Sequence, residues 1–216
     1  MKAKVHTIYE VDGKRVVGVT SVIGILNKPA LMHWAWQLGV KQIDYKKFVD
    51  EKAAQGTLAH AMILAHLWGQ KVDTADYSKN QIDAAENAFL SYLEWEKGKK
   101  IEPMIVEQPM TSAKWMYGGT PDFFGMIDGV PTLLDYKTSK ALYDEHIIQV
   151  AAYARLIEEA GHEVKDWKIL RIGRDEDEGF EVRDIKKAQL DVAWEIFRHC
   201  LGIYEAKKAL TKGGKS

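Results

Sequence analysis

Apolar positions in the first hundred residues repeat mostly at helical spacing, after one short hairpin. Residues 7–22, TIYEVDGKRVVGVTSV, are typical of a small hairpin that turns at Asp12-Gly13. Further along, apolar residues return every three or four positions, and two of these runs end near Gly69 and Gly98, where helices commonly stop. The pattern predicts three helices, over residues 28–43, 46–68 and 78–97.

Strand patterns dominate the next part of the chain. Residues 102–112 predict a strand, and residues 120–127 and 131–137 predict the two arms of a hairpin that turns at Asp128-Gly129. The remaining predicted elements are a helix over residues 142–160, strands over 166–173 and 180–185, and a helix over 186–210 followed by a basic tail.

These elements predict one α/β domain, residues 1–216, with a central mixed sheet flanked by helices. Residues 1–100 would form a mainly helical wall, residues 101–184 the sheet with its helix, and residues 185–216 a C-terminal helix and basic tail. The sequence contains no internal repeat and no Pro/Ser-rich linker that would divide it further.

Composition excludes several classes of protein. The chain is 46% hydrophobic with a net charge of -1, so affinity for nucleic acid would have to rest on a local patch and on metal ions. It has no apolar run of membrane-spanning length and no signal-peptide core, which predicts a cytoplasmic protein without a membrane partner. Its single cysteine, Cys200, excludes an internal disulfide, a cysteine-based zinc site and an iron–sulfur cluster.

Three charged residues meet at one end of the second hairpin. Asp122 lies near the start of one arm and Asp135 near the end of the other, so the turn brings both carboxylates to the same edge of the sheet. Two close carboxylates resist ionisation unless a cation lies between them, and oxygen ligands suit Mg²⁺ or Mn²⁺. Lys137 projects from the same strand face as Asp135 and could orient a metal-bound water. The set predicts metal-assisted phosphodiester hydrolysis.

A simpler interpretation makes the same residues structural. Asp135 and Lys137 could form a surface ion pair while Asp122 merely ends a strand, because the pattern D-x-K is common by chance. The hydrolytic interpretation gains support because both acids and the lysine lie in one strand–turn–strand, directly after an apolar run.

Four short segments carry a family resemblance. They are GTLAH at residues 56–60, GTPD at 119–122, LLDYKTSK at 133–140 and QVAAY at 149–153. In this order they resemble the helix motif, the acidic core and the QxxxY element of the PD-(D/E)xK nuclease superfamily, in its RecB-like and Cas4-like exonuclease branch. The similarity covers roughly residues 15–155. The clustered cysteines with which many relatives hold an iron–sulfur cluster are missing.

The resemblance implies a restriction-endonuclease-like core that binds Mg²⁺ or Mn²⁺. His60, Asp122, Asp135 and the backbone carbonyl of Tyr136 would be the ligands, and Lys137 would position or activate the attacking water. Without the resemblance, His60 would pass for an ordinary packed or solvated histidine of its helix.

The resemblance also assigns roles around this core. Gln149 and Tyr153 lie four residues apart on one helix face and would hold Lys137 and contact the substrate phosphate. Glu107 could serve a second metal, contact DNA or be an ordinary surface residue. Four further residues could bind backbone phosphate, although loop solvation or helix capping explains them nearly as well: Thr138, Ser139, Lys140 and Ser21.

The resemblance further implies a stand-alone, phage-type exonuclease that hydrolyses DNA from its ends in recombination or repair. Three alternatives stay open: a structure-specific or restriction-type endonuclease, a catalytically inactive nucleic-acid-binding module of the same fold, and a structural protein whose hairpin is coincidental. Val19 stands where a P-loop would need its lysine, so no ATP is expected. A ring-shaped homo-oligomer would suit a processive exonuclease, but the sequence leaves the oligomeric state open.

Overall fold

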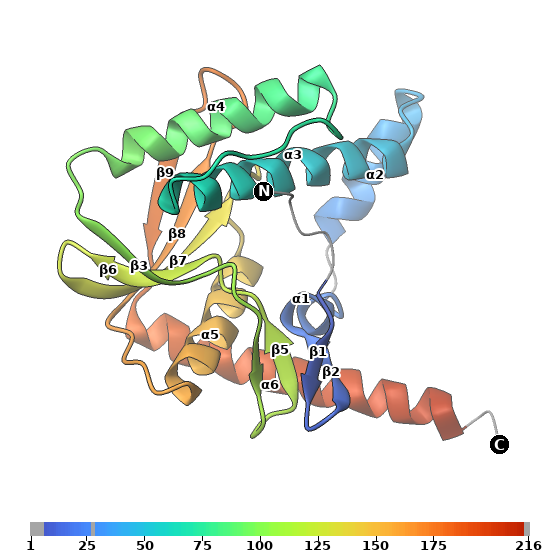
Figure 1. Ribbon diagram of the computed structural model, residues 1–216. Helices are drawn as coiled ribbons and strands as arrows, with labels where there is room; N and C mark the ends of the chain where they lie inside the picture. The colour runs from blue at the N-terminus through green and yellow to red at the C-terminus, as the bar shows by residue number, and fades with distance from the viewer. Residues whose placement is uncertain (1–6, 27–28, 214–216) are drawn as a thin grey trace.

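A five-stranded mixed sheet lies at the centre of the computed structural model, which describes residues 7–26 and 29–213 (Figure 1). The strand order is β3-β6-β7-β8-β9; β7 and β8 are parallel, and the other neighbours are antiparallel. The strands are β3 (Ile101–Val106), β6 (Phe123–Ile127), β7 (Val130–Lys137), β8 (Asp166–Ile172) and β9 (Phe180–Asp184). Helix α5 (Asp144–Glu159) provides the crossover that the parallel pair β7 and β8 requires.

Helices cover both faces of this sheet. The covering helices are α3 (Tyr45–Leu67) and α4 (Lys79–Glu96) on one face, and α5 and α6 (Lys187–Gly213) on the other. Because successive strand residues point to opposite faces, Leu134 packs into the core under α3 and α4, whereas Leu133 packs into the core with α5 and α6. By the same alternation, Asp135 and Lys137 lie on the α5 face of β7.

A second, smaller sheet lies beside the first. Its order is β1-β2-β5-β4, and β2 and β5 are parallel. It consists of β1 (Tyr9–Val11), β2 (Lys14–Gly18), β4 (Met110–Ser112) and β5 (Tyr117–Gly119), and the short helices α1 (Val19–Ile23) and α2 (Pro29–Val40) follow β2. The ring of Tyr9 on β1 lies very close to Gly118 on β5. A Cβ added at Gly118 would be 2.4 Å from that ring, so only glycine fits at this position.

The expected α/β fold class, with a central mixed sheet flanked by helices and a largely helical N-terminal part, is confirmed. Both predicted hairpin turns form at aspartate–glycine pairs with positive φ, at 48° and 72° for Asp12-Gly13 and 51° and 82° for Asp128-Gly129. No helix among the described residues combines the length and the apolar character that a membrane crossing needs.

The strand predicted over residues 102–112 was wrong in one respect, because the chain divides it between the two sheets. β3 belongs to the central sheet and β4 to the small sheet, with Glu107 in a left-handed conformation between them. Pro109 lacks an N–H and therefore does not favour continuous pairing here. The predicted start of the first long helix at residue 28 and the tail residues 214–216 lie outside the described residues, and α6 runs on to Gly213.

Candidate metal centre

The hairpin of β6 and β7 places Asp122 beside the end of β7, as expected. Phe123 pairs with Leu134, so Asp122 and Asp135 lie next to each other across the two strands. Both are buried, with 8% and 0% of their surface exposed. The backbone N–H of Tyr136 donates a hydrogen bond of 2.7 Å to Oδ2 of Asp122, and Oδ1 is on the side of His60.

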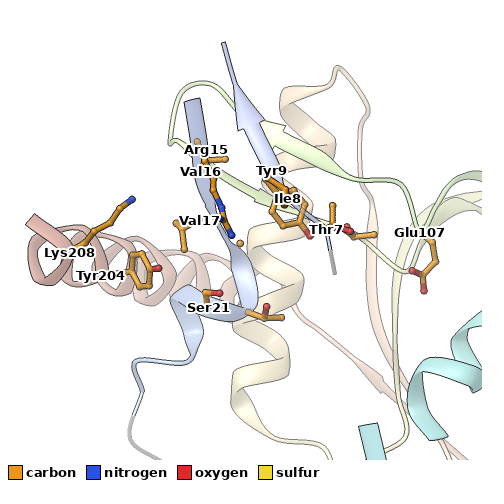
Figure 2. A pocket seen from close by; sticks show the side chains of 13 residues that line it. Thr7, Ile8, Tyr9, Arg15, Val16, Val17, Ser21, Glu107, Tyr204 and Lys208 are labelled. Carbon is orange, nitrogen blue, oxygen red and sulfur yellow. Dashed lines mark hydrogen bonds between the residues drawn. The ribbon is translucent and has the colours of Figure 1, made fainter. Parts of the chain in front are cut away.

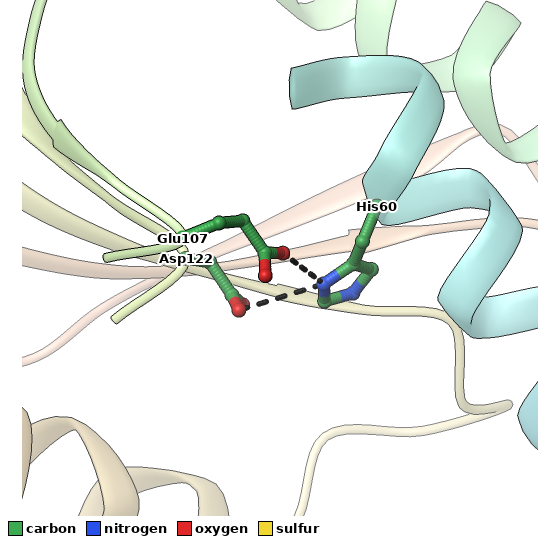
Figure 3. Close-up of side chains that lie close together, drawn as sticks. All are labelled: His60, Glu107 and Asp122. Atoms are coloured by element: carbon green, nitrogen blue, oxygen red, sulfur yellow. Dashed lines mark ion pairs between the residues drawn. The ribbon is translucent and has the colours of Figure 1, made fainter. Parts of the chain in front are cut away.

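His60 and Glu107 complete a cluster with Asp122. Nδ1 of His60 lies 3.4 Å from a carboxylate oxygen of Glu107 and 3.4 Å from Oδ1 of Asp122. One potential ligand atom from each of the three lies within 4.8 Å of the others. Figure 3 shows the imidazole reaching from α3 towards the two acids at the strand ends. The structure thus brings His60 and Asp122 together, and their role as metal ligands stays a prediction.

Glu107 owes its position to an unusual backbone. Its φ of 49° is left-handed, a conformation that costs energy for a residue with a side chain. Its N–H lies 3.1 Å from the carbonyl oxygen of Pro121 and 3.2 Å from that of Asp122, so the turn is fixed on the strand that carries the acid. The structure places Glu107 in the cluster with His60 and Asp122, while its predicted role, at a second metal or in contact with DNA, stays a prediction.

Burial and neighbouring charges have opposite effects on the pKa values of His60 and Asp122. Burial alone would lower the pKa of His60, but the Asp122 and Glu107 carboxylates raise it to about 10. Burial opposes ionisation of Asp122, yet His60, Lys137 and the Tyr136 N–H together hold the pKa of that carboxyl below its usual value. Both shifts favour a protonated imidazole beside an ionised Asp122 carboxylate.

Lys137 and Asp135 form a buried pair on the same strand. Nζ of Lys137 lies 2.5 Å from Oδ2 of Asp135. Burial raises the pKa of Asp135 to about 7 despite the opposing effect of Lys137, whereas Asp135 and Asp122 outweigh burial and raise the pKa of Lys137. Lys137 compensates the charge at Oδ2 of Asp135, whereas Oδ1 is buried with no hydrogen-bond partner among the described residues. A divalent cation would satisfy this remaining oxygen.

The donor set fits a hard divalent cation. Two or three carboxylates with one imidazole suit Mg²⁺ or Mn²⁺, and the nitrogen favours Mn²⁺ somewhat more than an all-oxygen site would. Asp135 lies outside the cluster of His60, Glu107 and Asp122, and its interaction with Lys137 would have to loosen for it to bind as well. The Tyr136 carbonyl stays a prediction as a ligand; the contact that Tyr136 makes with Asp122 is through its N–H.

Gln149 and Tyr153 lie on the face of α5 that meets this strand. Nε2 of Gln149 donates a hydrogen bond of 2.8 Å to the Tyr153 hydroxyl, and Gln149 lines the same cavity as Lys137. A Cβ at Gly119 would come within 2.6 Å of the Tyr153 ring, so the glycine creates the space for the tyrosine. The structure places Gln149 beside the site with Tyr153 bonded to it, while contact with Lys137 or phosphate stays a prediction.

The four predicted phosphate-binding residues lie around the site rather than in it. Thr138 packs against α3, where a Cβ on Gly56 would be 2.9 Å from its Oγ1. The Ser139 hydroxyl donates a hydrogen bond of 2.7 Å to the Ala141 carbonyl, and Lys140 is exposed. Ser21 lines a neighbouring cavity, as Figure 2 shows. Their role in substrate binding stays a prediction.

Two adjoining cavities surround the cluster. One, of about 730 Å³, contains His60, Asp122 and Lys137; the other, of about 770 Å³, extends past Ser21 to Arg15 and Lys208. Glu107 lies on the boundary and lines both cavities, as do Thr20, which precedes the predicted Ser21, and Thr120, which the sequence prediction missed. The sequence feature that could have identified Thr120 was its position directly before Pro121-Asp122.

The metal-free protein is expected to lose stability as pH rises from 7 to 10. The pKa of His60 is about 10 in the folded protein and 6.5 when unperturbed, so its contribution is fully present below pH 6.5 and is lost as pH rises through 10. A metal ion competes with this proton, so stabilisation by Mn²⁺ should grow over the same range. Thermal unfolding at several pH values, in EDTA and in Mn²⁺, measures both trends.

His60→Gln isolates the contribution of this histidine from that of every other group whose charge changes over the same pH range. The difference in melting temperature between wild type and variant in EDTA should shrink as pH rises. A difference that stays constant between pH 7 and 10 would show that His60 carries no proton in the folded protein.

Comparison with known proteins gives limited similarity. No protein-family model matches the chain, and no curated protein matches it in sequence. Among solved structures, the alkaline exonuclease LHK-Exo of Laribacter hongkongensis is similar with a TM-score of 0.39 at 15% identity, over 93% of this chain and 94% of that one. The complex of LHK-Exo with dAMP gives a TM-score of 0.45 at 13% identity, over 93% of each chain.

A predicted exonuclease from Eubacterium rectale gives a TM-score of 0.43 at 13% identity, over 67% of this chain. This chain spans 64% of the length of that protein. All three TM-scores are below 0.5, so neither residues nor activity can be transferred from these proteins.

Proposed function

We propose that the protein hydrolyses DNA phosphodiester bonds with the help of Mg²⁺ or Mn²⁺, acting as an exonuclease on DNA ends. The observation that carries the proposal is the cavity in which His60, Asp122 and Glu107 converge beside the buried pair of Asp135 and Lys137. A cluster of acids with one imidazole is suited to a divalent cation, and a lysine next to it is suited to a negatively charged substrate.

Each of these residues would have a distinct task. His60, Asp122 and Glu107 would hold the metal ion, joined by Asp135 once its interaction with Lys137 loosens. The bound ion would lower the pKa of a water molecule and neutralise charge on the phosphate. Lys137 would orient the attacking water and stabilise negative charge on the phosphate oxygens. The hydrogen bond of 2.8 Å between Gln149 and Tyr153 would fix the α5 wall beside it.

The choice of DNA ends as substrate rests on the ordered motifs. GTLAH places His60, and QVAAY places Gln149 and Tyr153, around the acidic hairpin in the order typical of RecB-like exonucleases. Ser21, Thr138, Ser139 and Lys140 would contact the DNA backbone near the reacting phosphate. A role in phage-type recombination or repair belongs to the same proposal.

Linear DNA is expected to disappear from its ends only when a divalent metal ion is present. End-labelled linear duplex and covalently closed circular DNA of the same sequence are incubated with Mg²⁺, Mn²⁺ or EDTA. Loss of the linear form alone, absent in EDTA, supports the exonuclease, and the label position gives its polarity. Cleavage of the circle would replace the exonuclease with an endonuclease.

A non-catalytic module of the same fold is the second candidate to be tested. It predicts binding of linear DNA without hydrolysis in Mg²⁺, Mn²⁺ and EDTA alike. The buried Oδ1 of Asp135, which has no hydrogen-bond partner among the described residues, weighs against it, because a module without a metal ion would gain nothing from this oxygen.

A further inference from the structure

One face of α3 forms a wall of the cavity that contains His60, Asp122 and Lys137, here called the metal cavity. Thr57, Ala61, Leu64 and Trp68 line it, and their spacing of four, three and four residues places them in one stripe along the helix. His60 belongs to the same wall, next to Ala61. The stripe becomes more apolar away from the metal cluster and ends in an indole ring.

Trp68 is unusual among the tryptophans of the described chain. Its exposed fraction is 48%, and within residues 7–26 and 29–213 its ring takes part in no aromatic pair and no cation–π contact. By contrast, Trp95, Trp167 and Trp194 are buried in the two cores. Trp68 therefore presents a half-exposed indole ring to the cavity.

The position of this ring suits a nucleobase. Trp68 follows His60 by eight residues, which corresponds to about 12 Å along a helix axis. Nucleotides stacked as in a duplex are spaced by about 3.4 Å, so this length corresponds to three or four nucleotides from the metal cluster. Along this length the cavity has charged groups at one end, for phosphate, and an apolar wall with an aromatic ring at the other, for bases.

We propose that Trp68 is a base-stacking residue, which binds an unpaired DNA strand three or four nucleotides from the bond that is cut. The inference rests on the proposed function and adds a substrate class, a strand that is single-stranded over these nucleotides. In an intact duplex the base faces are covered by their neighbours, so an indole ring can stack only on unpaired or terminal bases.

Binding of DNA without hydrolysis tests this separately from the nuclease activity. The probe is a fluorescently labelled single-stranded 12-mer, and its Kd is measured by anisotropy in EDTA. Stacking on one aromatic side chain contributes about 1–3 kcal/mol per base, so Trp68→Ala should weaken binding by about tenfold. Trp68→Phe should restore most of the affinity, whereas Trp68→Leu, apolar but not flat, should behave like the alanine variant.

Trp36 provides a matched control. It is also an exposed tryptophan, at 63%, but lies on α2 and does not line the metal cavity. Trp36→Ala should change the Kd by less than about twofold, since exposed substitutions away from a site have small effects. Equal affinity of wild type and Trp68→Ala, or equal loss in Trp36→Ala and Trp68→Ala, would overturn the proposal.

Kinetics separate failure of this inference from failure of the nuclease. With Mn²⁺ present, Trp68→Ala should raise KM for the 12-mer about tenfold. The KM for thymidine 5′-(p-nitrophenyl phosphate) should rise less, because this substrate is too short to reach the ring. Equal losses on both substrates would place Trp68 in the reaction centre and overturn the stacking role. Wild-type protein that hydrolyses neither substrate but binds the 12-mer through Trp68 would refute the nuclease alone.

Discussion

Replacing Lys137 with alanine is expected to lower kcat on linear DNA by about 10²–10⁴-fold, the usual contribution of one positioned acid–base group. The ammonium group lies 2.5 Å from Asp135, in the cavity that contains the metal cluster. Since Lys137 is not a metal ligand in the proposed site, Mn²⁺ should still stabilise the variant against heat. Single-turnover hydrolysis and thermal unfolding, each with and without Mn²⁺, measure the two effects.

Lys165→Ala is the matched control for this result. Lys165 is an exposed lysine that pairs with Glu163, far along the chain from the cluster. Its loss should leave kcat unchanged, because exposed ion pairs contribute little. A Lys137→Ala protein with wild-type kcat would return Asp135 and Lys137 to the simpler interpretation, a structural ion pair.

His60→Ala is expected to abolish most of the thermal stabilisation by Mn²⁺. A metal ion at one hundred times its Kd should stabilise the folded protein by about 2.7 kcal/mol, which corresponds to about 5–10 °C in a chain of this size. His60 supplies the one nitrogen among the cluster's ligand atoms and lies 3.4 Å from both carboxylates, so its loss leaves an incomplete site. The melting temperature is measured across a Mn²⁺ titration at pH 8.

His66→Ala serves as the control on the same helix. His66 pairs with Glu96 at 2.7 Å and lies outside the metal cluster. The variant should keep the full response to Mn²⁺, even if its melting temperature in EDTA is lower. If His60→Ala keeps the wild-type response as well, the metal ion binds elsewhere in the protein.

Local sequence patterns were sufficient to place the acidic hairpin. Asp128-Gly129 dictated a tight turn, and the turn alone set Asp122 against Asp135, because residue pairing in a hairpin follows from the position of the turn. The spacing of four residues likewise put Gln149 and Tyr153 on one face of α5. In each case the distance along the chain is short, so few arrangements were available.

Contacts between distant segments could not be read from local patterns. Glu107 reaches the cluster through a left-handed residue at the point where β3 leaves the central sheet, and its sequence neighbourhood looked like one continuous strand. The approach of α3 to the strand ends depends on how helices pack over the sheet. Local sequence patterns therefore did not identify His60 as a metal ligand, and only the family resemblance did. Trp68 gave no sequence signal, since an apolar residue at the end of a helix is ordinary.

The cluster of His60, Glu107 and Asp122 comes from three segments that are distant in the chain: α3, the end of β3 and the start of β6. No helix or hairpin formed on its own contains the complete set, and His60 and Asp122 meet only after the segment between them has folded. The proposed nuclease activity would therefore be absent from a nascent or partly unfolded chain. The recovery of hydrolysis after denaturation would accordingly report the last step of assembly, when helix and sheet dock, instead of the earlier appearance of secondary structure.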